Sequence, residues 1–241
     1  MKPKVLIFVI TYKASFRVLN IIKKIPLNYL NKNTNYNILI SDDNSEDDTI
    51  DFIYQAKKNL KSKIILNINK KNLGYGGNIK KCIKYAFKNK YDYAVMIHGD
   101  DQYHPKYLEK MLDILTSSKN FSAVSGSRMM KKKNALTGGM PIYKFIGNVF
   151  LTKLFNFIYL KNFSDCHTGY WAYNLKKINK KIFLSLDNKF CFDIDLRIKL
   201  VKKKLEISEI PIKTFYGNER SSIHFIYAFR FFYKVVLNAL F

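Results

Sequence analysis

Two rhythms of hydrophobic and polar residues alternate along the first half of the chain. Short apolar runs bounded by polar residues predict buried strands, and apolar residues that recur every three or four positions predict helices. The strands predicted in this way are 5–11, 37–41, 63–68, 93–97 and 121–125. The helices predicted between them are 16–25, 49–60, 78–88 and 106–116. This alternation predicts an α/β fold with a mostly parallel sheet and helices on both faces.

The second half of the chain is richer in aromatic residues. It predicts strands at 168–174 and 207–215 and a helix at 193–203. Two further segments, 143–160 and 224–241, combine aromatic residues with Lys or Arg at roughly helical intervals. The first fits a core-packing helix and a membrane-interface helix equally well. For the second we favour contact with a membrane interface or with another subunit.

The chain has neither internal repeats nor a low-complexity linker. Its 241 residues suffice to bury one substantial core. We therefore expect one α/β domain at 1–222, followed by a C-terminal interfacial or oligomer-contact helix at 223–241.

Charge is the most unusual feature of the composition. The chain has 42 Lys and Arg residues against 18 Asp and Glu, a net charge of +24, although its 48% hydrophobic and 25% charged content is ordinary. Such an excess favours anionic partners such as nucleotides or lipid headgroups. A general bias of the composition towards Lys, Asn and Ile explains it equally well, so charge alone does not select a function.

The cysteines and the apolar runs favour a cytoplasmic location. Cys82, Cys166 and Cys191 are odd in number and lack the spacing of a metal site, as expected of small buried residues in a reducing compartment. The first apolar run ends at Lys13, which suits a strand better than a signal peptide. No stretch reaches the ~18 apolar residues of a membrane span. We expect a cytoplasmic protein, peripheral at the inner face of the cell membrane.

Segment 98–105 (HGDDQYHP) is the most informative part of the chain. It follows the strand 93–97, and Pro105 suits the first turn of the next helix. Open α/β sheets bind ligands at this position, outside the carboxyl ends of their strands. An imidazole, two carboxylates and an amide gathered there predict a divalent cation and a phosphate-bearing substrate. A plain capped turn is the alternative interpretation.

Two further polar segments follow predicted strands. Segment 42–45 (DDNS) comes after the strand 37–41, so one sheet carries two acidic strand ends, although these residues are also typical of turns and N-caps. A glycine cluster that starts at Gly74 precedes the helix 78–88. Its backbone N–H groups can approach a phosphate, or the glycines form a plain loop.

Taken in order, these motifs resemble the family 2 glycosyltransferases of GT-A fold. The resemblance extends over nearly the whole chain and is strongest to the polyprenyl-phosphate sugar transferases, of which dolichyl-phosphate mannosyltransferase is the best-known type. It is carried by the segments 9–12 (VITY), 42–45, 98–105, 126–128 (GSR), 165–173 and 209–212 (EIPI). Each motif is weak by itself, and the ordered set is specific.

The resemblance implies a nucleotide-sugar site with a divalent metal, Mn²⁺ or Mg²⁺. The family's acidic motif reads D-x-D-x-Q-x-x-P, which places His98, Asp100 and Gln102 against the metal and the donor diphosphate. The imidazole of His98 suits Mn²⁺ better than Mg²⁺. Direct contact of His98 with phosphate, with the metal on Asp100, is the alternative. The residues expected to contact the nucleotide sugar are Thr11, Tyr12, Asp42, Asp43, Gly74, Asp100, Arg128 and Arg220.

Two of these residues are arginines. Arg128 follows the strand 121–125 and would add positive charge at the donor phosphates, or it is a surface charge. Arg220 lies in 216–222, which resembles the segment that closes over the donor in the family. Its position is offset from the family's usual basic residue.

The acceptor is the least determined part of the predicted reaction. A phosphate acceptor is nucleophilic at neutral pH, whereas a sugar hydroxyl needs a carboxylate base. Asp193 and Asp195 point in different directions on a helix. We expect at most one of them in the site and favour Asp193 as a catalytic residue beside Asp100, with Asp165 as a further candidate. Trp171 stands where the lipid-phosphate transferases often carry Arg, and it either stacks on a sugar or fills the core.

We therefore predict an inverting, metal-dependent, hexosyltransferase-like enzyme that moves a sugar from a nucleotide-diphosphate sugar to a polyprenyl phosphate. Its predicted partners include an anionic membrane surface and no nucleic acid. The runner-up acceptor is a hydroxyl of a cell-surface polysaccharide or glycolipid. The non-enzyme alternative is a basic nucleic-acid- or membrane-binding module, although the chain has no recognised nucleic-acid motif.

Overall fold

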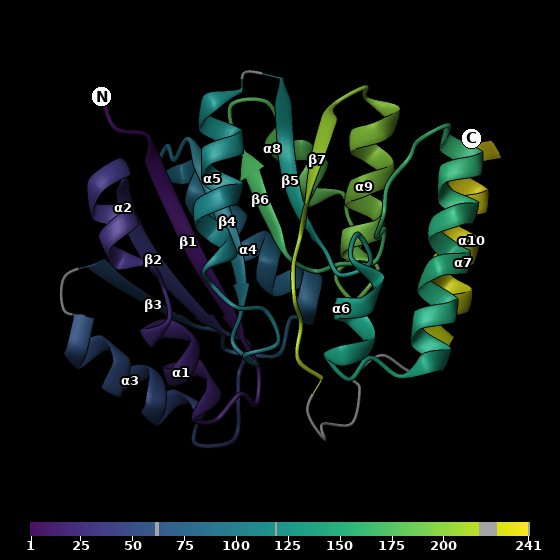
Figure 1. Ribbon diagram of the computed structural model, residues 1–241. Helices are drawn as coiled ribbons and strands as arrows, with labels where there is room; N and C mark the ends of the chain where they lie inside the picture. Colours follow the sequence, from purple (N-terminus) through teal and green to yellow (C-terminus); the bar gives the residue numbers. More distant parts are fainter. Residues whose placement is uncertain (61–62, 119, 217–225, 241) are drawn as a thin grey trace.

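A seven-stranded sheet forms the centre of the computed structural model, which describes residues 1–60, 63–118, 120–216 and 226–240 (Figure 1). The strand order is β3-β2-β1-β4-β6-β5-β7. Neighbouring strands are parallel, except that β6 runs antiparallel to β4 and to β5. The strands are β1 (Lys4–Thr11), β2 (Asn35–Asp42), β3 (Ile64–Ile68), β4 (Tyr93–His98), β5 (Phe121–Ser127), β6 (Trp171–Asn174) and β7 (Glu206–Pro211). The predicted mostly parallel α/β sheet is confirmed.

Helices cover both faces of this sheet (Figure 1). They are α1 (Arg17–Lys23), α2 (Leu27–Asn33), α3 (Thr49–Leu60), α4 (Tyr75–Lys88), α5 (Tyr107–Ser117), α6 (Lys132–Thr137), α7 (Ile142–Tyr159), α8 (Lys180–Leu184), α9 (Phe192–Lys202) and α10 (Ile226–Leu240). The sequence pattern missed α2, α6 and α8, which have five to seven residues and show at most two turns of a helical period. The two strands predicted in the second half are shorter than expected, since β6 begins at Trp171 and β7 ends at Pro211.

The central strands are apolar on both sides because helices cover both faces of the sheet. All of β1 after Lys4 is buried, as a parallel strand in this position requires. Its side chains alternate between two cores. Val5 and Ile7 pack with α1, α3 and α5, whereas Leu6 and Phe8 pack with α4, α8 and α9.

The register of the central strands brings three predicted site residues to one edge of the sheet. Thr11 at the end of β1 pairs with Asp42 at the end of β2. On the other side of β1, Ile10 pairs with His98 at the end of β4. Because the three strands are parallel, their carboxyl ends form a single edge, where α/β folds bind ligands.

The C-terminal helix α10 belongs to the same packed body. Its Val235 is fully buried in one hydrophobic cluster with Phe155 of α7 and Ile194 of α9. The hydroxyl of Tyr159 donates a hydrogen bond of 3.1 Å to the carbonyl of Val235. The expected boundary between 222 and 223 lies outside the described residues. Across the described ranges, no helix combines the length and the apolar character needed to cross a membrane.

The start of α4 packs so closely against the segment before α9 that it requires glycine. The N–H of Gly77 donates a hydrogen bond of 2.9 Å to the carbonyl of Asn188. A Cβ atom at Gly76 would overlap the carbonyl oxygen of Asp187. Gly147, in the middle of α7, has open space around it instead. The glycine cluster therefore serves close contact between two backbone segments of the protein itself.

This packing predicts opposite effects for two Gly→Ala substitutions. We expect Gly76→Ala to lower the free energy of unfolding by about 1–3 kcal/mol, because the new methyl group displaces the backbone at Asp187. Gly147→Ala is the matched control and should raise stability by about 0.5–1 kcal/mol, since alanine is the better helix former. Urea unfolding followed by circular dichroism measures both. Equal effects of the two substitutions would contradict the close packing at α4.

Candidate active site

Asp42 ties the ends of β1 and β2 to the turn that follows β2. Its carboxylate is fully buried and accepts hydrogen bonds from the Thr11 hydroxyl at 2.9 Å and from the Ser45 backbone N–H and hydroxyl at 2.8 and 2.6 Å. These bonds compensate the burial of the carboxylate. They also orient the strand end at which a nucleoside is expected.

Asp43, the next residue, anchors the loop that leads into α4. One carboxylate oxygen accepts from the Asn69 side chain and the Leu73 N–H, both at 2.8 Å. The other accepts from the N–H of Gly74 at 2.9 Å, and Gly74 has a φ of 79° that favours glycine. The N–H of Gly74 is thus directed at Asp43. Tyr12 is 49% exposed at the end of β1, beside this loop anchor. That these residues contact the nucleotide sugar stays a prediction.

His98 ends β4, and one of its ring nitrogens is held by the backbone of the loop before β6. Its Nε2 lies 2.9 Å from the carbonyl oxygen of Gly169, so Nε2 must donate and carries the proton. Burial lowers the pKa of His98, although the negative charge of Asp100 opposes this effect, so the ring is neutral at neutral pH. In a neutral ring with this tautomer, Nδ1 has the electron pair that a cation requires.

Gly169 makes this arrangement possible because it lies directly against the ring. A Cβ at position 169 would lie 3.0 Å from His98 and 2.9 Å from the hydroxyl of Tyr75. The loop before β6 therefore selects the tautomer of His98 through a backbone carbonyl. Sequence analysis did not assign this role to Gly169.

The two acidic residues after His98 point in different directions. Asp100 accepts a hydrogen bond of 3.0 Å from the backbone N–H of Gln102, which orders the turn. Asp101 has a φ of 62° and forms an ion pair of 2.5 Å with Lys24 instead. The turn thus keeps Asp100 close enough to His98 for its charge to act on the imidazole and directs Asp101 towards the end of α1.

The donor set of this turn fits a cation that binds together with a substrate. Among the described residues, no three His, Cys, Asp or Glu side chains converge on one point. His98 and Asp100 supply an imidazole nitrogen and a carboxylate, and the Gln102 amide is a weaker oxygen ligand. Mg²⁺ and related ions in phosphate-transfer sites are commonly held by one or two carboxylates, water and substrate phosphates. The residues present fit that mode of binding.

Asp193, at the start of α9, faces this group from the other side. One oxygen of its carboxylate accepts a hydrogen bond of 2.8 Å from the Tyr75 hydroxyl, which also lies 3.5 Å from Nε2 of His98. The second oxygen is buried and has no hydrogen-bond partner among the described residues. Burial raises the pKa of Asp193 to about 7, and the hydrogen bond from Tyr75 only partly opposes the effect. A carboxylate with this pKa suits general base catalysis.

Asp195 has a different environment, although it is only two residues further along α9. Its carboxylate forms an ion pair of 2.5 Å with Lys234 of α10.

The contact between Tyr75 and Asp193 was not predicted from the sequence, because Tyr75 lies among glycines at the start of α4 and is 118 positions away from its partner. Nothing in the local pattern marks it.

Arg128 is buried at the end of β5 and paired with Asp165. Its guanidinium donates to Asp165 at 2.7 and 2.9 Å and to the Tyr216 hydroxyl at 3.2 Å. Burial alone would raise the pKa of Asp165, but the charge and hydrogen bonds of Arg128 outweigh it and lower that pKa to about 2. The interpretation of Arg128 as a surface charge is therefore wrong. Its contact with donor phosphates stays a prediction, and Arg220 lies outside the described residues.

Trp171 fills the core and is fully buried. Its indole N–H donates to the carbonyl of Thr168 at 3.0 Å, and the guanidinium of Arg197 lies 4.7 Å from the ring centre. The interpretation of Trp171 as a ring that stacks on a sugar is therefore wrong. Arg197 is itself fully buried, so it provides no exposed cation at this position.

Sequence comparison identifies relatives over most of the chain. The family model described as glycosyl transferase family 2 matches residues 6–183. An uncharacterised protein of Methanocaldococcus jannaschii is 30% identical over 220 residues, which are 89% of this chain and 86% of that protein. The UDP-N-acetylglucosamine–dolichyl-phosphate N-acetylglucosaminyltransferase of Methanococcus voltae is 29% identical over 229 residues, 86% of each chain.

Structural comparison identifies the same fold in solved enzymes. Glucosyl-3-phosphoglycerate synthase from Mycobacterium tuberculosis, in complex with Mn²⁺, UDP-glucose and glycerol 3-phosphate, superposes with a TM-score of 0.69 at 13% identity, over 99% of this chain and 79% of that one. Its complex with Mg²⁺ and UDP gives a TM-score of 0.64 at 12% identity, over 99% and 78%. At this identity the similarity shows the fold, and it confirms the predicted GT-A architecture.

The raised pKa of Asp193 predicts a stability that falls with pH. Below its ordinary pKa of 3.8 the carboxyl is protonated in both the folded and the unfolded chain, so its burial does not lower the free energy of unfolding. As pH rises further, the unfolded chain ionises first, and the loss is complete once the folded carboxyl ionises near pH 7. Asp193→Asn lacks this loss. From pH 5 to pH 8 it should gain roughly 2 kcal/mol of unfolding free energy relative to the parent protein.

Urea titrations at the two pH values measure this gain, with Asp101→Asn as a control whose carboxylate is paired near the surface with Lys24. A difference between Asp193→Asn and the parent protein that does not change with pH would show that Asp193 ionises normally in the fold.

Proposed function

The chain belongs to glycosyltransferase family 2, and we propose that it is an inverting, metal-dependent enzyme that transfers a sugar to a polyprenyl phosphate at the cytoplasmic membrane face. It is a glycosyltransferase that uses a nucleotide-activated sugar. The non-enzymatic alternative is therefore no longer considered. The proposal concerns the metal, the acceptor, the residue roles and the place of action. The observation that carries it is the placement of His98 beside Asp100 at the end of β4, with Asp193 linked to His98 through the Tyr75 hydroxyl.

In this proposal the ends of β1 and β2 bind the nucleoside. Asp42, Asp43 and Thr11 form a hydrogen-bonded floor, and Tyr12 and Gly74 lie at its border. Because buried hydrogen bonds hold these side chains in place, we expect them to keep their positions when the nucleoside binds. Arg128, held by Asp165, is proposed to contact the diphosphate, as is Arg220 of the segment that follows β7.

His98, Asp100 and Gln102 would hold Mn²⁺ or Mg²⁺ together with the donor diphosphate. When bound, such a cation stabilises the negative charge that develops on the departing nucleoside diphosphate. The solved neighbours that contain Mn²⁺ or Mg²⁺ with UDP support this use of a metal. The Gly169 carbonyl keeps Nδ1 of His98 unprotonated, and an imidazole ligand favours Mn²⁺.

Sugar transfer is a single displacement, which inverts the anomeric carbon. An oxygen of the acceptor forms a bond to this carbon, while the bond from the carbon to the diphosphate oxygen breaks and that oxygen keeps the electron pair. A phosphate acceptor has no proton to lose. The similarity to the dolichyl-phosphate transferase of Methanococcus voltae supports a polyprenyl phosphate as the acceptor.

A hydroxyl of a polysaccharide or glycolipid is the second candidate acceptor, and Asp193 favours it. A hydroxyl must lose its proton during transfer, and a buried carboxylate with a pKa of about 7 can accept that proton. The oxygen of Asp193 without a hydrogen-bond partner is a suitable acceptor atom. For a phosphate acceptor, Asp193 would instead position Tyr75.

The proposed metal and donor site is tested by a pair of neighbouring substitutions. With Mn²⁺ and a panel of nucleotide sugars, we expect Asp100→Ala to lower kcat/KM by about 100-fold or more, because charge stabilisation of the leaving group is lost. Asp101→Ala, which removes only the ion pair to Lys24, should stay within about three-fold of the parent enzyme. The proposal would be contradicted if the parent protein showed no turnover and did not bind a nucleoside diphosphate.

The two acceptors are separated by Asp193→Asn, which keeps the shape and the hydrogen bond to Tyr75. With a polyprenyl phosphate acceptor, kcat should change only a few-fold. With a hydroxyl acceptor it should fall by about 10²–10⁴-fold, and the rise of rate around pH 7 should disappear. Initial rates from pH 5 to pH 9 with both acceptors measure this. Loss of activity on the phosphate acceptor would show that Asp193 has a different role.

A further inference from the structure

The outward side of α7 is apolar, contrary to the usual arrangement of a surface helix. Large hydrophobic residues with high exposure recur along it at intervals of three or four, up to 81% for Phe157 and 89% for Leu160. The exposed apolar residues of this row are Ile142, Ile146, Phe150, Phe157 and Leu160. Lys153 is the exposed polar residue within it. A long row of this kind on a protein surface marks a binding face.

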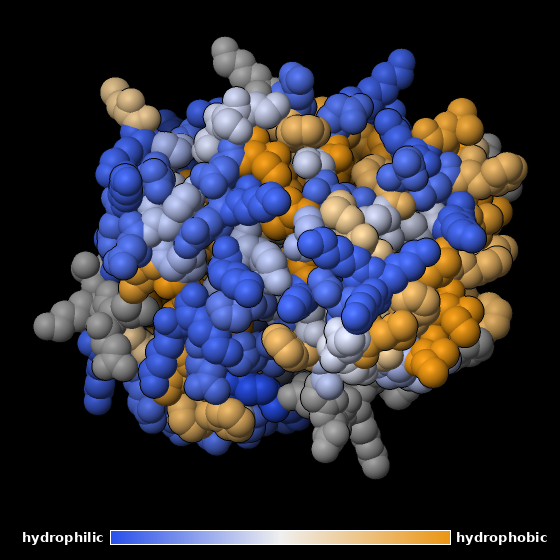
Figure 2. All heavy atoms as spheres, viewed as in Figure 1, coloured by the Kyte–Doolittle hydropathy of each residue, from blue (hydrophilic) through white to orange (hydrophobic). Residues whose placement is uncertain are grey.

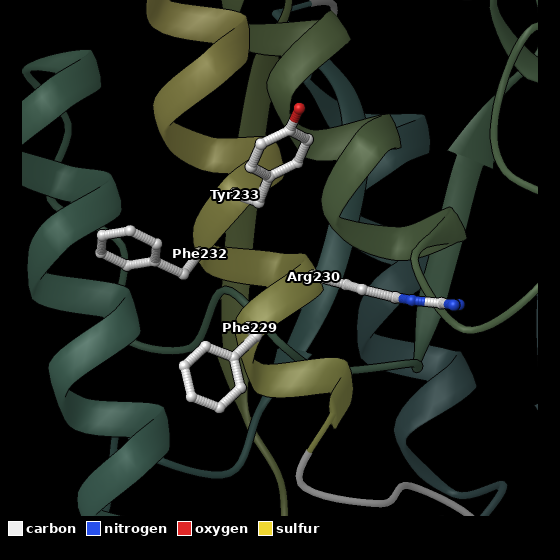
Figure 3. A pocket seen from close by; sticks show the side chains of 4 residues that line it. All are labelled: Phe229, Arg230, Phe232 and Tyr233. Atoms are coloured by element: carbon white, nitrogen blue, oxygen red, sulfur yellow. The ribbon is translucent and has the colours of Figure 1, made fainter.

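The neighbouring helix α10 extends this apolar row. Phe229, Phe232 and Tyr233 are 63, 43 and 63% exposed, and Figure 3 shows them projecting from α10 together with Arg230. These four side chains line a shallow hollow of about 360 Å³. Figure 2 shows the hydrophobic surface gathered on the side where Figure 1 places α7 and α10. We call this surface, formed by the exposed residues of α7 and α10, the aromatic face.

The aromatic face is presented by a firmly packed pair of helices. Beneath it, Phe155 of α7 and Val235 of α10 are fully buried. On the inner side of α10, Lys234 pairs with Asp195 of α9, and the Lys202 side chain donates to the Asn238 carbonyl at 2.8 Å. The core of the protein therefore accounts for the inner sides of the helices only. The exposed apolar side chains of α7 remain unexplained by packing within the described residues.

The charges on the outer side of α7 are positive. Neither α7 nor α10 contains an acidic residue, whereas α7 carries Lys144 and the exposed Lys153. The segment 131–133, at the start of α6 and close before α7 in the chain, is a run of three lysines. Cations that border an apolar helix face favour the interface of an anionic bilayer, where headgroups meet acyl chains.

We propose that the aromatic face docks the enzyme onto an anionic lipid bilayer, with α7 and α10 lying in the plane of the interface. Phe150, Phe157 and Phe232 insert among the acyl chains, and Lys153 contacts the headgroup phosphates. A second copy of the chain is a poorer occupant, because a two-fold symmetric contact would bring together two copies of the same positively charged surface, with no acidic residue on α7 or α10 to compensate. The inference depends on the proposed function only for the idea that the membrane supplies the acceptor.

Vesicle sedimentation tests the inference without any sugar donor or acceptor. The full chain should bind vesicles of phosphatidylcholine mixed with phosphatidylglycerol, and bind phosphatidylcholine alone much more weakly. Phe150→Ser combined with Phe157→Ser should weaken binding to anionic vesicles about ten-fold or more. Phe229→Ser combined with Phe232→Ser should do the same. Tyr54→Ser is the matched control, since Tyr54 is 49% exposed on α3, away from the aromatic face.

The outcomes separate this inference from the proposed reaction. Loss of vesicle binding in both double variants, with binding retained in Tyr54→Ser, supports the docking face even if no transfer activity is found. Unchanged binding in the double variants, or no binding by the parent protein, overturns it. A parent dimer in light scattering that the same substitutions dissociate also overturns it, because the aromatic face would then hold a second copy.

Discussion

Parallel pairing of β1 with β2 and β4 is the constraint on which the site depends. Because these strands run in one direction and in this register, Thr11, Asp42 and His98 end at the same edge of the sheet. Two helices separate each of these residues from the next along the sequence, so no local structure could place them together. The apolar residues that bury β1 on both faces hold that register, since a shift of one position would turn each side chain towards the opposite core.

Buried carboxylates of this protein behave differently because their partners differ. Asp42 and Asp43 accept several hydrogen bonds each and stabilise the turns after β2. Asp165 has Arg128 beside it, and its pKa falls to about 2. Asp193 is also buried but has no ion-pair partner among the described residues, and burial outweighs the hydrogen bond from the Tyr75 hydroxyl, so its pKa rises to about 7. The fold thus keeps one carboxylate of this edge able to exchange a proton at neutral pH.

Helix α9 connects the two surfaces for which we propose functions. Asp193 lies on its side facing Tyr75 and His98, while Asp195 pairs with Lys234 of α10. A helix that carries both residues fixes the distance between the reaction edge and the aromatic face. An enzyme whose acceptor is a lipid phosphate needs such a fixed relation, because the acceptor headgroup can rise only a limited height above the bilayer.

Hydrophobic periodicity and motif order were enough to predict the GT-A fold and the five strands of the first half, because the strand pattern is local and the motifs follow the strands in order. Short helices such as α2 carry too little pattern to be predicted. The partners of Asp193, His98, Arg128 and Trp171 come from distant segments, so their roles were decided by the tertiary structure alone. Sequence supplied the reactive groups and their strand ends. Packing decided which of them are neutralised, which tautomer His98 adopts and which helix sides remain apolar and exposed, because each depends on neighbours many residues away.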